Sequence, residues 1–368
     1  MSSKMSSYVL LLSDQTAQLL AEYKMQILSN ELKPSFNLKV HLQNSKPLPE
    51  LTNEEFLQLL LLTKKITCFA ESEISGDGSD WNPTELRILG DVSVAMSAMA
   101  FDNGVWDVHE KTFKTHDPPV PVKLIFTPGP LLHGSRFRST TPDFDDISDH
   151  GQISQVRYNA VIERRLLPAF LYANETAKQE GRKALLVLPG LGCGQFAGKF
   201  HGKMGEHLNQ ALQAILKKFD FENIACVRFD PYSECVDFEQ EIKYVKYRVR
   251  LNVGPLGKSQ LCHVRDYEET QGEFEGCILY KIVAWDHASL PGNDYFLGCR
   301  TTDDGVTAAA TNSMELLTGV VGSYSQPGYF MPPAGTGSWR TVASKNKTRL
   351  LAEGNIKVAL GNGLVELS

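Results

Sequence analysis

The chain lacks the features of several common protein classes. No apolar run approaches the ~20 residues of a membrane-spanning helix, and the apolar stretch near the N-terminus is too short for a signal peptide. The chain has 37 basic and 43 acidic residues, which gives a formal net charge of -6. A general DNA- or RNA-binding surface needs an excess of basic side chains against the phosphates. The sequence therefore predicts a soluble protein with no membrane span and no nucleic-acid partner.

The cysteine pattern gives no indication of disulfide bonds. The seven cysteines form an odd set, and no CxxC pair occurs among them. Secreted disulfide scaffolds and structural zinc sites depend on such pairs and spacings. We therefore expect a reducing compartment and no structural metal.

What the sequence does contain is an alternation of strands and helices from residue 82 onward. Buried strands are predicted at 92–101, 120–127, 184–188, 224–229 and 278–284, and helices at 155–180, 203–219 and 304–318. The first strand is expected to end in a turn at 102–104. Continuously apolar strands are typical of sheets covered on both faces. The sequence therefore predicts an α/β fold with a mainly parallel or mixed sheet and helices on both faces.

Three further segments complete the predicted organisation. Residues 1–80 are expected to form an N-terminal helical extension, in which Thr52 and Glu55 make a capping box. Residues 81–330 form the main domain, and 331–368 pack on it. An inserted β-hairpin is predicted at 237–276, with strands at 245–251 and 261–264. Its basic face (Lys246, Arg248 and Arg250) is either a solvated strand face or a docking surface for an acidic partner.

A glycine-rich loop follows the strand at 184–188. It has glycines at 190, 192, 194 and 198. It is not a GxGxxG motif, because residue 195 is Gln, and it is not a P-loop, because Phe200 follows Lys199. Such a loop ahead of a helix can present backbone N–H groups to a diphosphate. The alternative is a plain tight turn between strand and helix.

A cluster of aspartates follows the strand at 278–284. Asp286, Asp294, Asp303 and Asp304 lie within 19 residues of one another, at the carboxyl edge of the sheet, where ligands bind in open α/β folds. Taken singly, Asp303 or Asp304 could be an N-cap and Asp294 a turn residue. Taken together, carboxylates can deprotonate a water, stabilise an oxocarbenium-like transition state and hold a guanidinium. The group favours cleavage of an N-glycosidic bond to arginine.

These motifs resemble those of a known family. The loop residues Gly190, Leu191, Gly192, Cys193, Gly194, Gln195 and Phe196 resemble the diphosphate loop of macrodomains, and Phe101, Asp102 and Asn103 resemble the start of their adenosine side. The spacings of eight and ten residues between Asp286, Asp294 and Asp304 resemble those of MavL-type macrodomain effectors of intracellular bacteria.

The resemblance, which covers residues 82–330, carries several implications. It implies ADP-ribose as ligand or product, with no cofactor and no metal. It further implies hydrolysis of ADP-ribosyl-arginine on ubiquitin and secretion into the host cytoplasm.

Three functions remain open from the sequence. The first is an ADP-ribosyl hydrolase that uses Asp286, Asp294, Asp304 and Asp303. The second is a reader module that binds ADP-ribose without chemistry. The third is an interaction protein that docks a partner through the basic hairpin.

Overall fold

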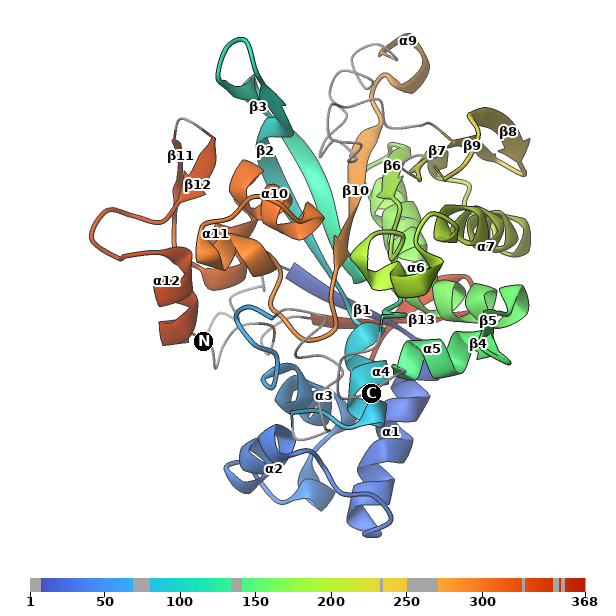
Figure 1. The fold of residues 1–368 in the computed structure, drawn as a ribbon, viewed down its shortest axis with the longest axis vertical. Helices are drawn as coiled ribbons and strands as arrows, with labels where there is room; N and C mark the ends of the chain where they lie inside the picture. The colour runs from blue at the N-terminus through green and yellow to red at the C-terminus, as the bar shows by residue number, and fades with distance from the viewer. Residues whose placement is uncertain are drawn as a thin grey trace.

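A ten-stranded mixed sheet forms the centre of the protein (Figure 1). A computed structural model describes residues 8–68, 80–133, 141–231, 234–249, 271–325, 328–346, 351 and 355–367. The strands follow one another across the sheet as β14 (Gly363–Glu366), β13 (Asn355–Leu360), β1 (Tyr8–Ser13), β2 (Ser93–Asp107), β3 (Thr112–Pro128), β10 (Ile278–Trp285), β6 (Ala184–Pro189), β7 (Ile224–Asp230), β9 (Val245–Val249) and β8 (Phe238–Ile242). From β3 to β9 every pair is parallel, which confirms the predicted α/β class.

Helices cover both faces of this sheet and enclose two separate hydrophobic cores. One core lies under α5 (Pro142–Ile147), α6 (Gln155–Gln179) and α7 (Met204–Lys218). The other lies under α1 (Asp14–Leu28), α2 (Phe36–Gln43), α3 (Asn53–Leu61), α4 (Pro83–Gly90), α10 (Asp303–Ala310), α11 (Ser313–Thr318) and α12 (Trp339–Asn346). The short elements include α9 (Gln271–Phe274) and the pairs β4 (Ser148–Asp149) with β5 (Gln152–Ile153) and β11 (Ser323–Ser325) with β12 (Tyr329–Met331). They also include the 3₁₀ helices η1 (Leu48–Glu50), η3 (Gln195–Phe200) and η4 (Asn293–Leu297). Alternate side chains of the central strands feed the two cores, as burial on both faces requires.

The N-terminal segment is more than a set of helices. Its strand β1 lies inside the large sheet, parallel to β13 and antiparallel to β2. The predicted capping box at α3 is present, since the amide of Glu55 donates to the Thr52 hydroxyl over 3.1 Å and the amide of Thr52 donates to Glu55 over 2.7 Å. Residues 8–68 therefore share the sheet and a core with the rest of the described chain.

Two predicted elements have the wrong boundaries. The first strand does not stop at 102–104, because β2 continues to Asp107 through an irregularity at which Gly104 takes a positive φ of 78°. The helix expected at 304–318 is split into α10 and α11. There Thr311 is extended (φ -131°, ψ 169°) and forms a β-bridge with Ala100 on β2, and the next residue, Asn312, exchanges hydrogen bonds with the backbone of Met99. Gly319 has the expected left-handed conformation after α11.

The basic hairpin differs from its prediction as well. Strand β9 pairs with β8 and β7, whereas its predicted partner at 261–264 lies outside the described residues, as does Arg250. Arg248 forms ion pairs with Glu239 (2.5 Å) and Glu273 (3.0 Å), and Lys246 contacts the same two glutamates. Because acidic side chains of the protein itself neutralise Lys246 and Arg248, these two residues do not offer a free basic surface.

Candidate active site

A cavity of about 340 Å³ lies at the carboxyl edge of β10 and β6. That volume is within the usual range for small-molecule sites. The residues that line it come from the N-terminal segment, the ends of β3 and β10, the glycine loop, the aspartate loop and the start of α10: Thr67, Cys68, Gly129, Gly190, Gly192, Gly194, Gln195, Phe196, Ala284, Trp285, Asp286, Asn293, Asp294, Thr301, Thr302, Asp303 and Asp304. The fold therefore brings together the two motifs that the sequence singled out.

The glycine loop packs directly against the end of β3. A Cβ atom on Gly129 would lie 2.7 Å from the backbone nitrogen of Gly192, and Gly192 has a φ of +74°. Only glycine tolerates both the close approach and the positive φ. Gly194 has open space where a side chain would be, on the cavity side of the loop. A ligand can therefore come up to the backbone there.

Two predicted loop residues lie beneath the cavity and do not line it. Leu191 and Cys193 are almost fully buried in the core under α6 and α7. Burial raises the pKa of the Cys193 thiol well above its ordinary value, and the nearby Glu234 adds to this effect. A thiol held in its neutral form is a poor nucleophile, so Cys193 has a packing role.

Asp286 follows β10 directly and is held by its own loop. Its Oδ1 accepts hydrogen bonds from the amides of Ala288 (2.7 Å) and Ser289 (2.6 Å), and its Oδ2 accepts from the Ser289 hydroxyl and the Asn293 side chain. These donors fix the carboxylate of Asp286 at the carboxyl end of β10. Only 6% of the surface of this residue is exposed.

Asp294 lies in the 3₁₀ turn η4 (Asn293–Leu297) and reaches toward α10. Its carboxylate accepts from the amides of Thr301 (2.8 Å) and Thr302 (3.0 Å). It also lies against Gly305, where a Cβ atom would be only 1.4 Å from Asp294 Oδ1. The glycine at 305 therefore makes room for this carboxylate.

Asp304 is the most buried of the three carboxylates. Its Oδ2 accepts from the amides of Gly292 (3.1 Å) and Asn293 (2.9 Å), and its Oδ1 contacts the Thr302 hydroxyl at 2.8 Å. Burial, followed by the charge of Asp286, raises the pKa of Asp304 to about 7, and the charge of Asp294 adds to the shift. Asp304 can therefore both take up and release a proton near neutral pH.

Asp303 has a different position from its neighbour. Its Oδ2 accepts from the amide of Ala284 over 2.7 Å, and the ammonium of the buried Lys281 lies 4.0 Å from its Oδ1. The N-cap of α10 is Thr302, not an aspartate. Asp303 thus ties the start of α10 to the end of β10, at the wall of the cavity.

Sequence reasoning missed the contribution of residues 64–68. Lys64 is fully buried; its ammonium donates to the carbonyl of His287 over 2.6 Å and lies 4.1 Å from the centre of the Trp285 ring. Burial lowers the pKa of Lys64 to about 7, against the opposing charge of Asp286. The backbone of Lys65 also pairs with Ala288 and Leu290. No local signal marks this segment, because its role exists only through contacts more than 200 residues apart in the chain.

A buried network lies on the far side of the aspartate loop. Arg165 of α6 forms ion pairs with Asp91 (2.9 Å) and Asp143 (2.6 Å), and Asp143 contacts the ring of His287 at 2.9 Å. Burial alone would raise the pKa of Asp143, but the charges of Arg165 and His287 hold it well below its ordinary range. His287 is therefore anchored as a structural residue beside Asp286.

The residues predicted for the adenosine side lie outside the cavity lining. Asp102 is fully buried, forms an ion pair with Arg300 and accepts a hydrogen bond from Tyr324 at 2.7 Å. Phe101 stacks on Tyr324, with ring centres 5.1 Å apart, and Asn103 is almost fully buried. Phe101 and Asp102 therefore connect β2 to the C-terminal part of the chain, whereas the Asn103 side chain accepts from the amide of Val105 on its own strand.

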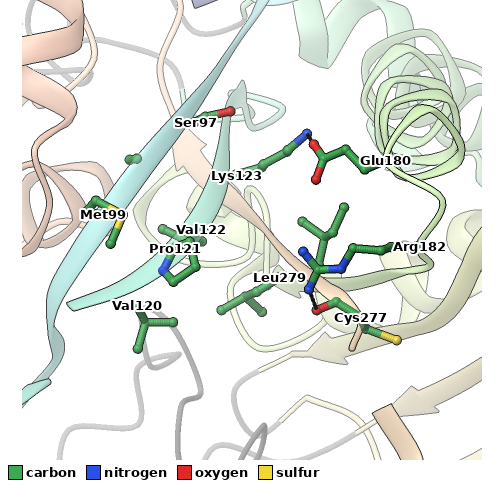
Figure 2. A pocket seen from close by; sticks show the side chains of 12 residues that line it. Ser97, Met99, Val120, Pro121, Val122, Lys123, Glu180, Arg182, Cys277 and Leu279 are labelled. Carbon is green, nitrogen blue, oxygen red and sulfur yellow. Dashed lines mark hydrogen bonds and ion pairs between the residues drawn. The ribbon is translucent and has the colours of Figure 1, made fainter. Parts of the chain in front are cut away.

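A second cavity of similar volume lies at the opposite edge of the sheet (Figure 2). Its wall is largely apolar, and its charged groups are already paired: Lys123 with Glu180, and Arg182 with the carbonyl of Cys277 at 2.9 Å. Ligand sites of open α/β sheets lie at the carboxyl ends of the strands. We therefore assign the candidate active site to the first cavity.

The part of the chain that the structure describes has no evident metal centre. It contains no group of three or more His, Cys, Asp or Glu side chains able to hold a metal ion. Among the same residues, no helix is both long and apolar enough to span a bilayer. None of the six cysteines described forms a disulfide.

The fold and the site define a macrodomain-type α/β protein with a ligand cavity between a glycine loop and an aspartate loop. The family model of the macrodomain effector MavL matches residues 8–336. The chain belongs to this family of macrodomain effectors, and its function accordingly concerns ADP-ribose. No curated protein matches the chain.

Proposed function

We propose that this protein is an ADP-ribosyl hydrolase that cleaves the N-glycosidic bond between ADP-ribose and an arginine side chain of a protein. The observation that supports this function is the meeting of Asp286, Asp294 and Asp304 in one cavity beside the glycine loop. A site that only binds ADP-ribose has no need to bring three carboxylates together, which is costly because like charges repel.

In this reaction a water attacks the anomeric carbon of the ribose, the bond from that carbon to the guanidine nitrogen breaks, and ADP-ribose and arginine are released. Asp304, whose pKa lies at about 7, takes the proton from the water and passes it to the guanidine nitrogen as the bond breaks, so that arginine leaves as its guanidinium. Asp286 and Asp294 stabilise the oxocarbenium-like transition state and hold the guanidinium leaving group. The glycine loop binds the diphosphate through backbone N–H groups.

The wider setting is proposed on the family resemblance. Ubiquitin is the modified protein and the host cytoplasm is the place of action. The catalytic step derived from the cavity does not depend on either, because it involves only the ADP-ribosyl group and the arginine to which it is attached.

A reader module that binds ADP-ribose without chemistry is the second candidate. It is favoured by the hydrogen bonding of Asp294, which accepts from two amides and two hydroxyls of its own loop. Such bonds would stabilise the loop even if no reaction took place.

The deciding experiment measures release of ADP-ribose from arginine-ADP-ribosylated ubiquitin, and from another protein modified on arginine, by wild type and by Asp294→Ala. Release by the wild type, lost in the variant, supports the hydrolase. No release by the wild type, with ADP-ribose binding retained in calorimetry, rejects the hydrolase and leaves the reader. Release from the second protein but not from ubiquitin rejects ubiquitin alone.

A further inference from the structure

Asn293 occupies a central place between the carboxylates and the N-terminal segment. It directly precedes Asp294 and lines the cavity. Its side-chain amide donates to Asp286 Oδ2 over 3.1 Å, and its backbone N–H donates to Asp304 Oδ2 over 2.9 Å. One residue therefore contacts two of the carboxylates and is covalently linked to the third.

The other bonds of this side chain go to the segment before residue 69. The amide nitrogen donates to the carbonyl of Cys68 over 2.6 Å. The amide oxygen accepts from the Thr67 hydroxyl (2.6 Å) and from the amide of Cys68 (2.7 Å). An asparagine side chain has two N–H donors and two acceptor lone pairs, so its whole capacity is used. This saturation fixes both its position and its amide orientation.

We infer that Asn293 is a positioning residue for the proposed hydrolysis. Its hydrogen bonds to Thr67 and Cys68 hold it in place. From this position it sets the spacing of the Asp286, Asp294 and Asp304 carboxylates. The inference rests on the proposed function. It assigns to residues 67–68 the task of holding the aspartate loop in its reactive geometry. Asn293 contacts carboxylates and backbone only, and the reacting atoms remain with the aspartates.

A change of charge at this residue has a defined consequence. In Asn293→Asp the oxygen that accepts from Thr67 and Cys68 is kept, but the donors to Asp286 and to the Cys68 carbonyl are lost. An additional carboxylate then faces the Asp286 carboxylate and the Cys68 carbonyl, and like charges raise the pKa of neighbouring acids. The charges that act on Asp304 are those of Asp286 and Asp294 on the facing loop. Asp303 on its own helix lines the same cavity, and the ammonium of Lys64 lies behind the loop at the His287 carbonyl.

Asn312 provides the matched control. It is also a loop asparagine whose Oδ1 accepts a backbone N–H, that of Met99 at 2.8 Å, at the other end of α10. Asn312→Asp makes the same chemical change, keeps the acceptor and lies outside the cavity lining. Any general loss of stability that follows from replacing an asparagine by an aspartate therefore affects both variants.

The experiment compares wild type, Asn293→Asp and Asn312→Asp by the pH dependence of kcat and KM for ADP-ribose release. A ¹³C NMR titration of the Asp304 carboxyl is recorded in parallel. For Asn293→Asp we expect kcat to fall about 10²-fold, as misplacement of reacting groups does, with little change in KM. The pH midpoint and the Asp304 titration move upward by about one unit. Asn312→Asp follows the wild type in all readouts.

Identical behaviour of the two aspartate variants overturns the inference. If the wild type releases no ADP-ribose, the proposed function is rejected. The NMR titration alone then tests the positioning role of Asn293. If Asn293→Asp leaves the titration of Asp304 unchanged, the positioning role is rejected. Should Asn293→Asp fail to fold, Thr67→Val removes a single bond to Asn293 and is expected to lower kcat in the same direction. Unchanged kcat in folded Thr67→Val then overturns the inference.

Discussion

The ammonium group of Lys64 donates a hydrogen bond to the main-chain carbonyl of His287 over 2.6 Å, from a position with no exposed surface. This contact is one of several that join the N-terminal segment to the aspartate loop, beside the backbone bonds of Lys65 and the bonds of Thr67 and Cys68 to Asn293. It also places a titrating cation directly behind Asp286, whose charge opposes the loss of the Lys64 proton.

Replacing Lys64 by methionine changes the pH dependence of stability. The pKa of Lys64 is about 7 in the folded protein and near its ordinary value of about 10.4 in the unfolded chain. The unfolded chain therefore binds more protons between these values, and the free energy of unfolding of the wild type rises across them. Lys64→Met lacks this rise and releases ADP-ribose more slowly, because the His287 carbonyl loses its donor.

Urea unfolding at pH 7 and pH 9 measures the effect. Lys65→Met is the control, since the Lys65 ammonium lies nearer the surface, 3.2 Å from Asp80. If Lys64→Met gains as much stability between the two pH values as the wild type, Lys64 does not titrate as described.

Replacing Asp304 by asparagine is expected to separate stability from activity. The pKa of Asp304 is raised to about 7 in the folded protein, mainly by burial, so the folded state binds more protons than the unfolded chain between about pH 4 and pH 7. The contribution of Asp304 to the free energy of unfolding is therefore fully present at low pH, and it is lost as the pH rises through 7. The neutral amide of the substituted side chain mimics the protonated acid at every pH.

Asp304→Asn should accordingly have a higher Tm than the wild type at pH 8 and a similar Tm at pH 4.5. Release of ADP-ribose should fall about 10²–10⁴-fold, as loss of a general acid–base does. Thermal melts at the two pH values check the first statement and initial rates the second. A Tm difference that does not depend on pH would show that Asp304 does not titrate between pH 4.5 and pH 8 in the folded protein.

Replacing Gly305 by alanine places a methyl group where the Asp294 carboxylate lies, since the added Cβ would be 1.4 Å from Asp294 Oδ1. Alanine favours a helix interior by about 1 kcal/mol over glycine, so α10 itself tolerates the change. We expect Asp294 to be displaced and the rate of release to fall about 10²-fold while the helix content stays the same.

Gly363→Ala is a suitable control for that variant, because a Cβ there meets only Glu175 Oε1 at an ordinary 3.4 Å. Circular dichroism and release assays on both variants give the comparison. Full activity in Gly305→Ala would mean that Asp294 is not needed in its observed position.

The ion pair between Asp102 and Arg300 predicts a stability effect. Both side chains are almost fully buried, and removing one partner of a buried pair costs about 3–5 kcal/mol because the other charge is left unpaired. Asp102→Ala should therefore destabilise strongly in urea, and Asp102→Leu combined with Arg300→Met should destabilise less. ADP-ribose affinity should be unchanged in the folded variants. A loss of affinity would instead support the contact with the adenosine side that the sequence suggested.

The sequence by itself determined the elements and the two motifs of the site. The apolar strands at 184–188 and 278–284 are buried on both faces of the sheet, and their continuously apolar composition predicts this burial. The glycine loop and the aspartates at 286, 294 and 304 follow these two strands. The structure places these two parallel strands side by side, so both motifs lie at the same edge of the sheet and line one cavity.

Only the tertiary structure decided how each residue is used. The pKa of Asp304 depends on burial and on the charges of Asp286 and Asp294, and Arg248 is neutralised by two glutamates from other elements. The N-terminal segment supplies β1 to the sheet and residues 64–68 to the aspartate loop. Periodicity and spacing report local backbone geometry, whereas burial and charge pairing arise from contacts between distant parts of the chain, so the sequence could not fix them.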